Sequence, residues 1–168
     1  MLVSDPAQAF ERHHRAVYRF LFRMSGDRAV AEELTQDTFL RAVRMAAAPH
    51  GWNANSERSW LFRVARNLLL NHRRNDERRP RYSPIEDAEV RDVRAGAQED
   101  KAALREAIAA LAIADREVVL LRELGGLTYE EIAGVTDTTA DAVRSRLHRA
   151  RLALRDALGS REHKGSTP

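Results

Sequence analysis

The chain contains no cysteine, which excludes disulfides, thiolate metal ligands and direct thiol-based redox sensing. It also has no stretch of about 18 consecutive apolar residues, the length that a membrane-spanning helix requires. Charged residues appear early, at Asp5, Glu11 and Arg12, so the start does not resemble a secretory signal peptide. We therefore expect a cytoplasmic protein with no membrane insertion.

Lysine is scarce, since Lys101 and Lys164 are the only two lysines among 28 lysine and arginine residues. Arginine stays charged at neutral pH and presents a planar fork that matches phosphate groups and guanine edges. A genome biased toward arginine would give the same total. The places where arginines cluster are therefore more informative than their number.

Strand patterns are missing as well, because no segment alternates apolar and polar residues as a half-buried strand would. Helical periodicity fades after Pro80, where acidic residues dominate, and returns near Ala103. We therefore expect an all-α protein with two small helical domains joined by a flexible acidic linker. From the N-terminus, the expected segments are a first domain at 5–80, a linker at 81–100, a second domain at 101–160 and a polar tail at 161–168.

Three helices are expected in the first domain. They run from about Pro6 to Met24, from Asp27 to about Ala46, and onward from Ser56, which is a good N-cap residue. Each has apolar residues at helical spacing that should face inward. These are Phe10, Val17, Leu21 and Met24 in the first helix, Ala31, Leu34, Phe39, Ala42 and Val43 in the second, and Trp60, Leu61, Val64, Ala65 and Leu68 in the third.

The second domain should begin with a helix over 103–111. Its inward-facing stripe consists of Leu104, Ile108 and Leu111. Asp115 is expected to cap the next helix, and the glycine pair Gly125 and Gly126 to end it, because glycine adopts the left-handed conformation found after helix ends.

The most informative segment, 128–155, has the pattern of a helix-turn-helix. Thr128 and Glu131 form a capping box, the polar residues 136–139 form a turn, and a second helix begins near Ala140. The outward face of that helix carries Arg144, Ser145, Arg146, His148, Arg149, Arg151 and Arg155. Such a positively charged second helix is typical of one that enters the DNA major groove, although solvent-facing arginines are also common in other helices.

A second basic surface is expected in the first domain, where aromatic and amide side chains accompany arginine. It comprises Trp52, Asn53, Asn55, Trp60, Arg63, Arg66 and Asn67. Stacking on aromatic rings and hydrogen bonding to amides are how proteins hold single-stranded nucleic acid. Trp60 also lies on the apolar side of its helix, so a core position is the simpler interpretation for that residue.

Several segments, in this order and spacing, resemble the extracytoplasmic-function (ECF) sigma factors, group IV of the sigma-70 family. Residues 31–42 (AEELTQDTFLRA) and 60–68 (WLFRVARNL) are similar to domain 2 of that family. Residues 116–118 (REV), 127–133 (LTYEEIA) and 144–151 (RSRLHRAR) are similar to its domain 4. The resemblance covers nearly the whole chain. It implies an RNA polymerase sigma factor that directs promoter-specific initiation.

The resemblance also implies a role for each surface. The second helix would dock on the β′ clamp helices of core RNA polymerase through Glu32, Glu33, Gln36, Asp37 and Arg41. The promoter −10 element, with a base flipped from the non-template strand, would be held by Asn53, Asn55, Trp60, Arg63, Arg66 and Asn67. The −35 element would be bound by Arg144, Ser145, Arg146, His148 and Arg149, of which Arg146 suits a phosphate contact or packing. The polymerase β flap and an inhibitory anti-sigma factor would be further partners.

The sequence departs from the family's pattern in the turn of the helix-turn-helix. Asp137 stands where the family usually has glycine, and Thr138 stands where it usually has an apolar residue. Aspartate tolerates left-handed backbone geometry better than most other non-glycine residues, so the turn remains feasible.

Two other classes of function remain open at this point. A stand-alone helix-turn-helix regulator could carry the same recognition helix, but it would not need the aromatic and amide surface of the first domain. The sequence gives little support to an enzyme, because its six histidines form no metal-binding pattern and no phosphate-binding glycine loop is present. We therefore expect no metal or other cofactor. The acidic linker would either lie in a polymerase channel or serve as a solvated tether.

Overall fold

The computed structural model describes residues 5–48, 57–77 and 95–162, and within these ranges the chain is entirely helical. The helices are α1 (Pro6–Ser25), α2 (Arg28–Ala46), α3 (Glu57–Asp76), α4 (Ala95–Ala109), α5 (Ile113–Glu123), α6 (Tyr129–Thr136) and α7 (Ala140–Glu162). The expectation of an all-α fold is confirmed. The expected N-cap Ser56, the amide-bearing loop before it and most of the linker lie outside the described residues.

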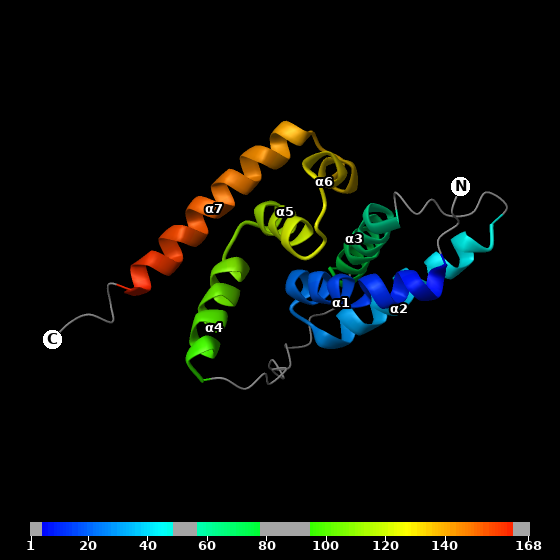
Figure 1. The fold of residues 1–168 in the computed structure, drawn as a ribbon, viewed down its shortest axis with the longest axis horizontal. Coiled ribbons are helices and arrows are strands. Elements are labelled where there is room, and N and C mark those ends of the chain that lie inside the picture. Colours follow the sequence, from blue (N-terminus) through cyan, green and yellow to red (C-terminus); the bar gives the residue numbers. More distant parts are fainter. Residues whose placement is uncertain (1–4, 49–56, 78–94, 163–168) are drawn as a thin grey trace.

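Helices α1, α2 and α3 form a bundle, and α5 and α6 lie between this bundle and the long helix α7 (Figure 1). Helix α4 packs against α7 and lies to the left of the bundle in Figure 1. None of the described helices is long and apolar enough to cross a membrane.

Local sequence explains where α1 and α2 begin and end. The Asp5 carboxylate caps α1 by accepting from the Ala7 N–H at 3.0 Å, and Pro6 occupies the first turn, where its missing N–H is no loss. Gly26 ends α1 in the left-handed conformation, with φ of 71°. The Asp27 carboxylate then caps α2 by accepting from the Val30 N–H at 3.1 Å. This arrangement folds α2 back onto α1.

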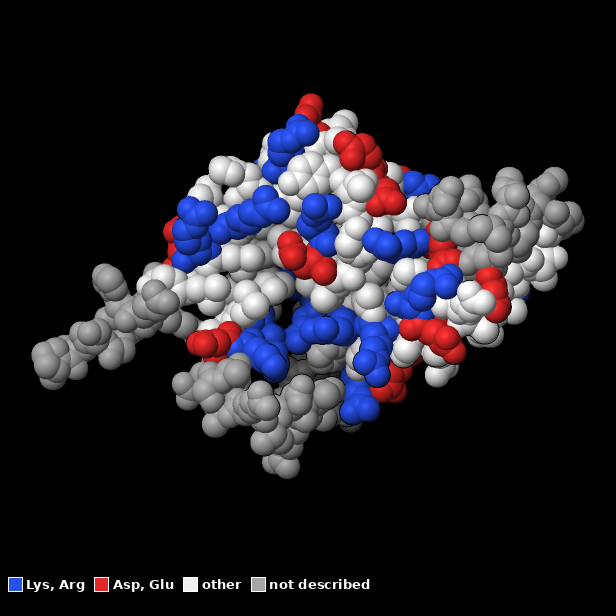
Figure 2. Space-filling view, in the orientation of Figure 1, with Lys and Arg blue, Asp and Glu red and all other residues white. Residues whose placement is uncertain are grey.

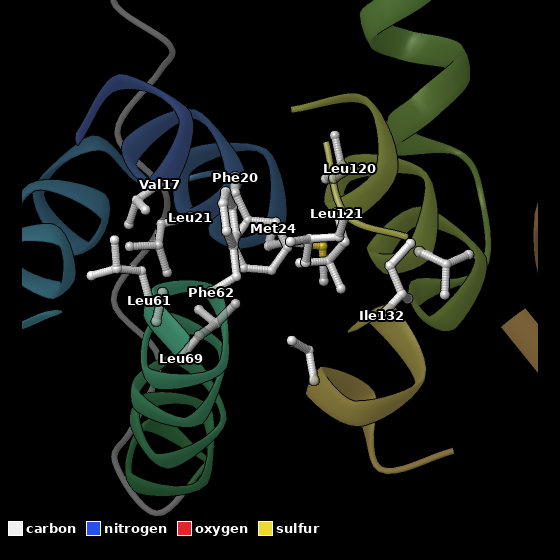
Figure 3. Close-up of a cluster of buried hydrophobic side chains, with 14 of the residues drawn as sticks. Val17, Phe20, Leu21, Met24, Leu61, Phe62, Leu69, Leu120, Leu121 and Ile132 are labelled. Carbon is white, nitrogen blue, oxygen red and sulfur yellow. The ribbon is translucent and has the colours of Figure 1, made fainter. Parts of the chain in front are cut away.

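The hydrophobic core runs continuously from the α1–α3 bundle into α5 and α6. Phe20 and Phe62 are both fully buried, and their rings meet edge to face with centroids 5.6 Å apart. Figure 3 shows these rings and Met24 meeting Leu121 of α5, with Ile132 of α6 beyond it. The two halves of the chain, which sequence periodicity presents as separate modules, therefore share one apolar interior.

Three residues expected to face inward are exposed instead. Phe10 is 46% exposed, because it lies against Phe39 and His14 and leaves the rest of its ring in solvent. Val43, at 54%, belongs to the last turn of α2, and Leu104, at 42%, lies on α4. Periodicity alone placed these residues in stripes without showing where the neighbouring helices cover them.

The predicted capping role of Asp115 is wrong. Helix α5 begins two residues before it, with Ala112 at the N-cap position and no side-chain capping hydrogen bond. Asp115 is 9% exposed in the first turn of α5, and its carboxylate accepts from Arg149 of α7 at 2.8 Å. The acidic side chain thus joins two helices rather than starting one.

The predicted capping box is present. The Thr128 hydroxyl accepts from the Glu131 N–H at 3.2 Å, and the Thr128 N–H donates to the Glu131 carboxylate at 2.8 Å. Asp137 ends α6 with φ of 53° and ψ of 48°, the left-handed geometry that glycine more often supplies. The turn of the helix-turn-helix therefore forms despite the substitution.

Replacing Thr128 by Ala should lower the free energy of unfolding by about 1 kcal/mol, because it leaves a helix N–H without its acceptor. Denaturant titration followed by circular dichroism measures the change. Thr128→Ser keeps the hydroxyl and is the matched control, expected to stay close to wild type. An alanine variant as stable as the serine variant would contradict a stabilising role for the cap.

Candidate nucleic-acid and polymerase interfaces

The exposed face of α7 brings together most of the residues expected to bind the −35 element. Arg144, Ser145, His148 and Arg149 are all exposed there, whereas Arg146 is half-buried. The opposite side of α7 is an apolar stripe packed on the core, in which Val143, Leu147 and Ala150 are at most 2% exposed. A helix fixed by that stripe presents its polar side chains at helical spacing to solvent.

Two arginines of this face are held in place by neighbours. Arg144 pairs with Asp141 one turn earlier and lies over the Tyr129 ring, 5.8 Å from its centroid. Arg149 donates from Nη2 to the Asp115 carboxylate at 2.8 Å, and this hydrogen bond raises the pKa of Arg149. Both guanidinium groups therefore start from defined positions, and both remain 59% exposed.

Two of the −10 candidates on α3, Arg63 and Arg66, are arranged differently, because they hydrogen-bond to α6 and α5. Arg66 is only 14% exposed and donates from Nε to the Glu117 carboxylate of α5 at 2.8 Å. Arg63 donates to the Gly134 carbonyl of α6. Asn67 is exposed and Trp60 is half-buried against the core. The remaining candidates, Asn53 and Asn55, lie outside the described residues.

A shallow cavity of about 260 Å³ lies where α3 meets α6. It is lined by Ser59, Trp60, Arg63, Glu131, Gly134 and Val135. Trp60 thus borders both the core and the cavity. The expectation that it is a core residue is therefore confirmed in part.

The expected polymerase-binding face of α2 is open to solvent. Glu32, Glu33, Gln36 and Arg41 are exposed, and Asp37 is half-buried. Glu32 accepts from Arg28 at 2.8 Å, whereas Glu33 is exposed and forms no ion pair within the described residues. Leu40, 54% exposed, was not among the candidates, although a large apolar side chain exposed on a helix often marks a protein-binding surface.

A buried polar cluster at the start of α3 was also missed. Glu57 is 3% exposed, and its Oε1 accepts from Arg12 Nη2 at 3.0 Å and from Arg12 Nε at 3.3 Å. The same oxygen lies 2.8 Å from His13 Nε2. Burial lowers the pKa of His13, and the Glu57 carboxylate offsets part of that effect. The partners are more than 40 residues apart, so no local sequence signal could have joined them.

Charges of both signs are interspersed on the face of the molecule shown in Figure 2. In the view of Figure 2, arginine side chains are spread over several helices, with acidic side chains between them. The described residues contain no group of three or more potential metal ligands.

Comparison with known proteins gives matches in both halves of the chain. The family models for sigma-70 region 2 and sigma-70 region 4 match residues 9–79 and 101–154. The chain is 38% identical to the ECF RNA polymerase sigma factor SigC of Mycobacterium tuberculosis over 141 residues, which is 82% of this chain and 75% of SigC. It is 33% identical to SigE of Mycolicibacterium smegmatis over 159 residues, 88% of this chain but only 59% of SigE.

A solved structure shares the fold. It is the sigma factor RpoE in complex with the anti-sigma factor NepR from Bartonella quintana, which matches with a TM-score of 0.69 and 24% sequence identity. The match covers 91% of this chain and 96% of the other. The helical arrangement in Figure 1 is therefore also found in the RpoE chain of that complex.

Proposed function

Because the chain belongs to the ECF sigma factors of the sigma-70 family, we propose that it binds core RNA polymerase and directs it to promoters with −10 and −35 elements. The observation that carries the proposal is the presence of region 2 and region 4 in one chain, each with a polar helix face of the expected kind. Sigma factors are not enzymes, which agrees with the sequence-based expectation. The proposal places the chain in the cytoplasm, where transcription occurs.

The polymerase contact is assigned to α2. Its exposed face is acidic at Glu33 and Asp37 and apolar at Leu40, a combination that suits a basic and apolar partner surface. The β′ clamp helices of polymerase are the proposed partner here, and the β flap is the proposed partner of region 4. Helix α2 packs on α1 and α3 through its opposite face, so docking would not disturb the core.

Promoter contacts are assigned to α3 and α7. Arg144, His148 and Arg149 on α7 would read or flank the −35 element in the major groove. Arg63, Arg66 and Asn67 on α3 would hold the separated non-template strand of the −10 element. Single-strand binding energy offsets the few kcal/mol needed to unstack each flipped base.

An inhibitory anti-sigma factor is part of the proposal. Its support is the RpoE chain of the same fold, which was solved together with an anti-sigma factor.

Run-off transcription with purified core polymerase tests the proposal. Core enzyme plus this chain should produce a promoter-specific transcript, and core enzyme alone should not. Absence of a transcript from every template of the source genome would contradict it. Failure to retain core polymerase in a pull-down would then favour the stand-alone regulator.

Reversing the charge at Asp37 should weaken the binding of core polymerase by roughly tenfold, because a like charge would then face the basic partner. Asp37→Arg is compared with Glu11→Arg, which makes the same charge change on the exposed side of α1. Affinity is measured by fluorescence anisotropy with labelled chain. Equal affinities of the two variants would remove Asp37 from the contact.

Replacing Arg149 by Ala should weaken binding of the polymerase holoenzyme at the −35 element by about 1–3 kcal/mol if the guanidinium reads a base. The substitution also removes the partner of the buried Asp115 carboxylate, so the control is Asp115→Asn, which breaks the ion pair and keeps the guanidinium. Footprint titration should show the loss only with Arg149→Ala. An unchanged footprint would exclude Arg149 from the reading set.

A further inference from the structure

One arginine of the exposed α7 face is contacted from two sides by other residues of region 4. Arg144 is 59% exposed, and its Nη1 donates to the Asp141 carboxylate one turn earlier in the same helix. Its guanidinium carbon also lies 5.8 Å from the ring centroid of Tyr129, the first residue of α6. Both helices of the helix-turn-helix therefore restrict a side chain that is open to solvent.

The Tyr129 ring is itself held in place. It is half-buried and packs against the hydrophobic core. The guanidinium carbon of Arg122 in α5 lies 5.5 Å from the same ring centroid, and Arg122 Nη1 donates to the Leu127 carbonyl at 2.7 Å. The capping box at Thr128 fixes the backbone directly before the ring. Tyr129 thus gives Arg144 a fixed aromatic surface for a cation–π contact.

The contact with Asp141 leaves one edge of the Arg144 guanidinium for another partner. A guanidinium carries its donors on Nε and on two terminal nitrogens, in a planar fork. Nη1 is bonded to Asp141, while Nε and Nη2 make no hydrogen bond to the residues that the structure describes. Two donors on one edge match the O6 and N7 acceptors that guanine presents in the major groove.

The Asp141 carboxylate also favours a base over a phosphate as that partner. It lies in the first turn of α7, and its side chain is 91% exposed. A negative charge next to the guanidinium repels a phosphate oxygen, whereas O6 and N7 of guanine are uncharged acceptors that it repels much less. The ion pair therefore directs Arg144 toward base edges rather than toward the DNA backbone.

We propose that Asp141 and Tyr129 are positioning residues, which hold Arg144 so that it reads one guanine of the −35 element. This inference rests on the proposed function and narrows it from binding of the −35 element to the choice of one base. Both residues act through Arg144. A side chain that is already held in its bound position loses less conformational freedom on binding, so the preference for guanine increases.

Holoenzyme binding to a promoter identified by run-off transcription tests the base assignment. Each base pair of the −35 element is changed in turn, and affinity is measured by footprint titration. At one guanine the wild type should lose roughly tenfold on change to adenine, and it should also bind more weakly when 7-deazaguanine removes the N7 acceptor. Arg144→Ala should abolish both differences. Equal weakening by Arg144→Ala on every duplex would indicate a phosphate contact and overturn the proposal.

The positioning role is tested by variants that keep Arg144. Asp141→Ala and Tyr129→Leu should each lower the guanine preference by roughly threefold, because an unrestrained side chain must be ordered on binding. Asp141→Asn keeps an acceptor and Tyr129→Phe keeps the ring, so both should retain most of the preference. Glu130→Ala, which removes an exposed acid from the first turn of α6, is the matched control and should behave as wild type.

A residue that only stabilised the fold would weaken binding to all duplexes equally. Full guanine preference in both Asp141→Ala and Tyr129→Leu would therefore overturn the positioning role, and so would a uniform loss across the duplexes. Either result can occur while run-off transcription succeeds, so the proposed function would remain.

A measurement on the free chain needs neither polymerase nor promoter. In NMR spectra, the Arg144 side-chain resonances should be displaced by the Tyr129 ring, with the displacement lost in Tyr129→Leu and kept in Tyr129→Phe. Absence of this displacement in the wild type would overturn the proposal. If the chain ignores polymerase, the proposed function is removed and the same duplexes are offered to the chain alone. A guanine preference that depends on Arg144 would then uphold the inference, and its absence would overturn it.

Discussion

The fold depends on the burial of α3 from two sides. Leu61 and Leu69 of this helix pack into the α1–α3 bundle, while Phe62 reaches Leu121 and the turn after α5 (Figure 3). A helix buried on one side presents a polar face to solvent, but a helix buried on two sides keeps a smaller part of its surface for polar residues. Arg58, Arg63 and Arg66 belong to this polar part of α3, and each of them donates a hydrogen bond to an oxygen atom of region 4. The same contact therefore holds region 4 in place and supplies hydrogen-bond partners to the proposed DNA-binding residues Arg63 and Arg66.

The apolar and polar parts of this contact have different physical roles. Burial of Phe62 and its neighbours removes apolar surface from water and stabilises the packing of region 4 on α3 by about 25 cal/mol for each Å². This term has no direction, so it does not fix how the two surfaces are oriented. The Arg66–Glu117 pair adds little net stability, because both groups lose hydration when they are 14% and 9% exposed. It does fix the register of α3 against α5, since a displaced Arg66 would be buried without a partner.

Sequence reasoning succeeded where structure is determined locally. The Thr128 capping box, the Asp27 start of α2 and the left-handed Asp137 each depend on residues within one helical turn. It failed where the partner lies far along the chain. Asp115 looked like a cap and instead binds Arg149, 34 residues away, and Glu117 binds Arg66 across 51 residues. Periodicity identifies one apolar face of a helix but not the neighbour that covers it, which is why Phe10 and Val43 were expected to be buried. The residues expected on the outer faces of α2 and α7 are exposed apart from Asp37 and Arg146, which are half-buried. Nothing in the sequence indicated that α3 would contact region 4 of the same chain.

The glycine inside α6 shows how closely the two regions are fitted. Glycine in a helix interior costs about 1 kcal/mol relative to alanine, so Gly134 is unfavourable for α6 considered alone. A Cβ atom at this position would lie 3.3 Å from the terminal nitrogen of Arg63, closer than most side-chain contacts. The missing side chain lets the guanidinium of α3 reach the Gly134 carbonyl. A glycine that weakens the first helix of the helix-turn-helix thus lies at its contact with Arg63 of region 2.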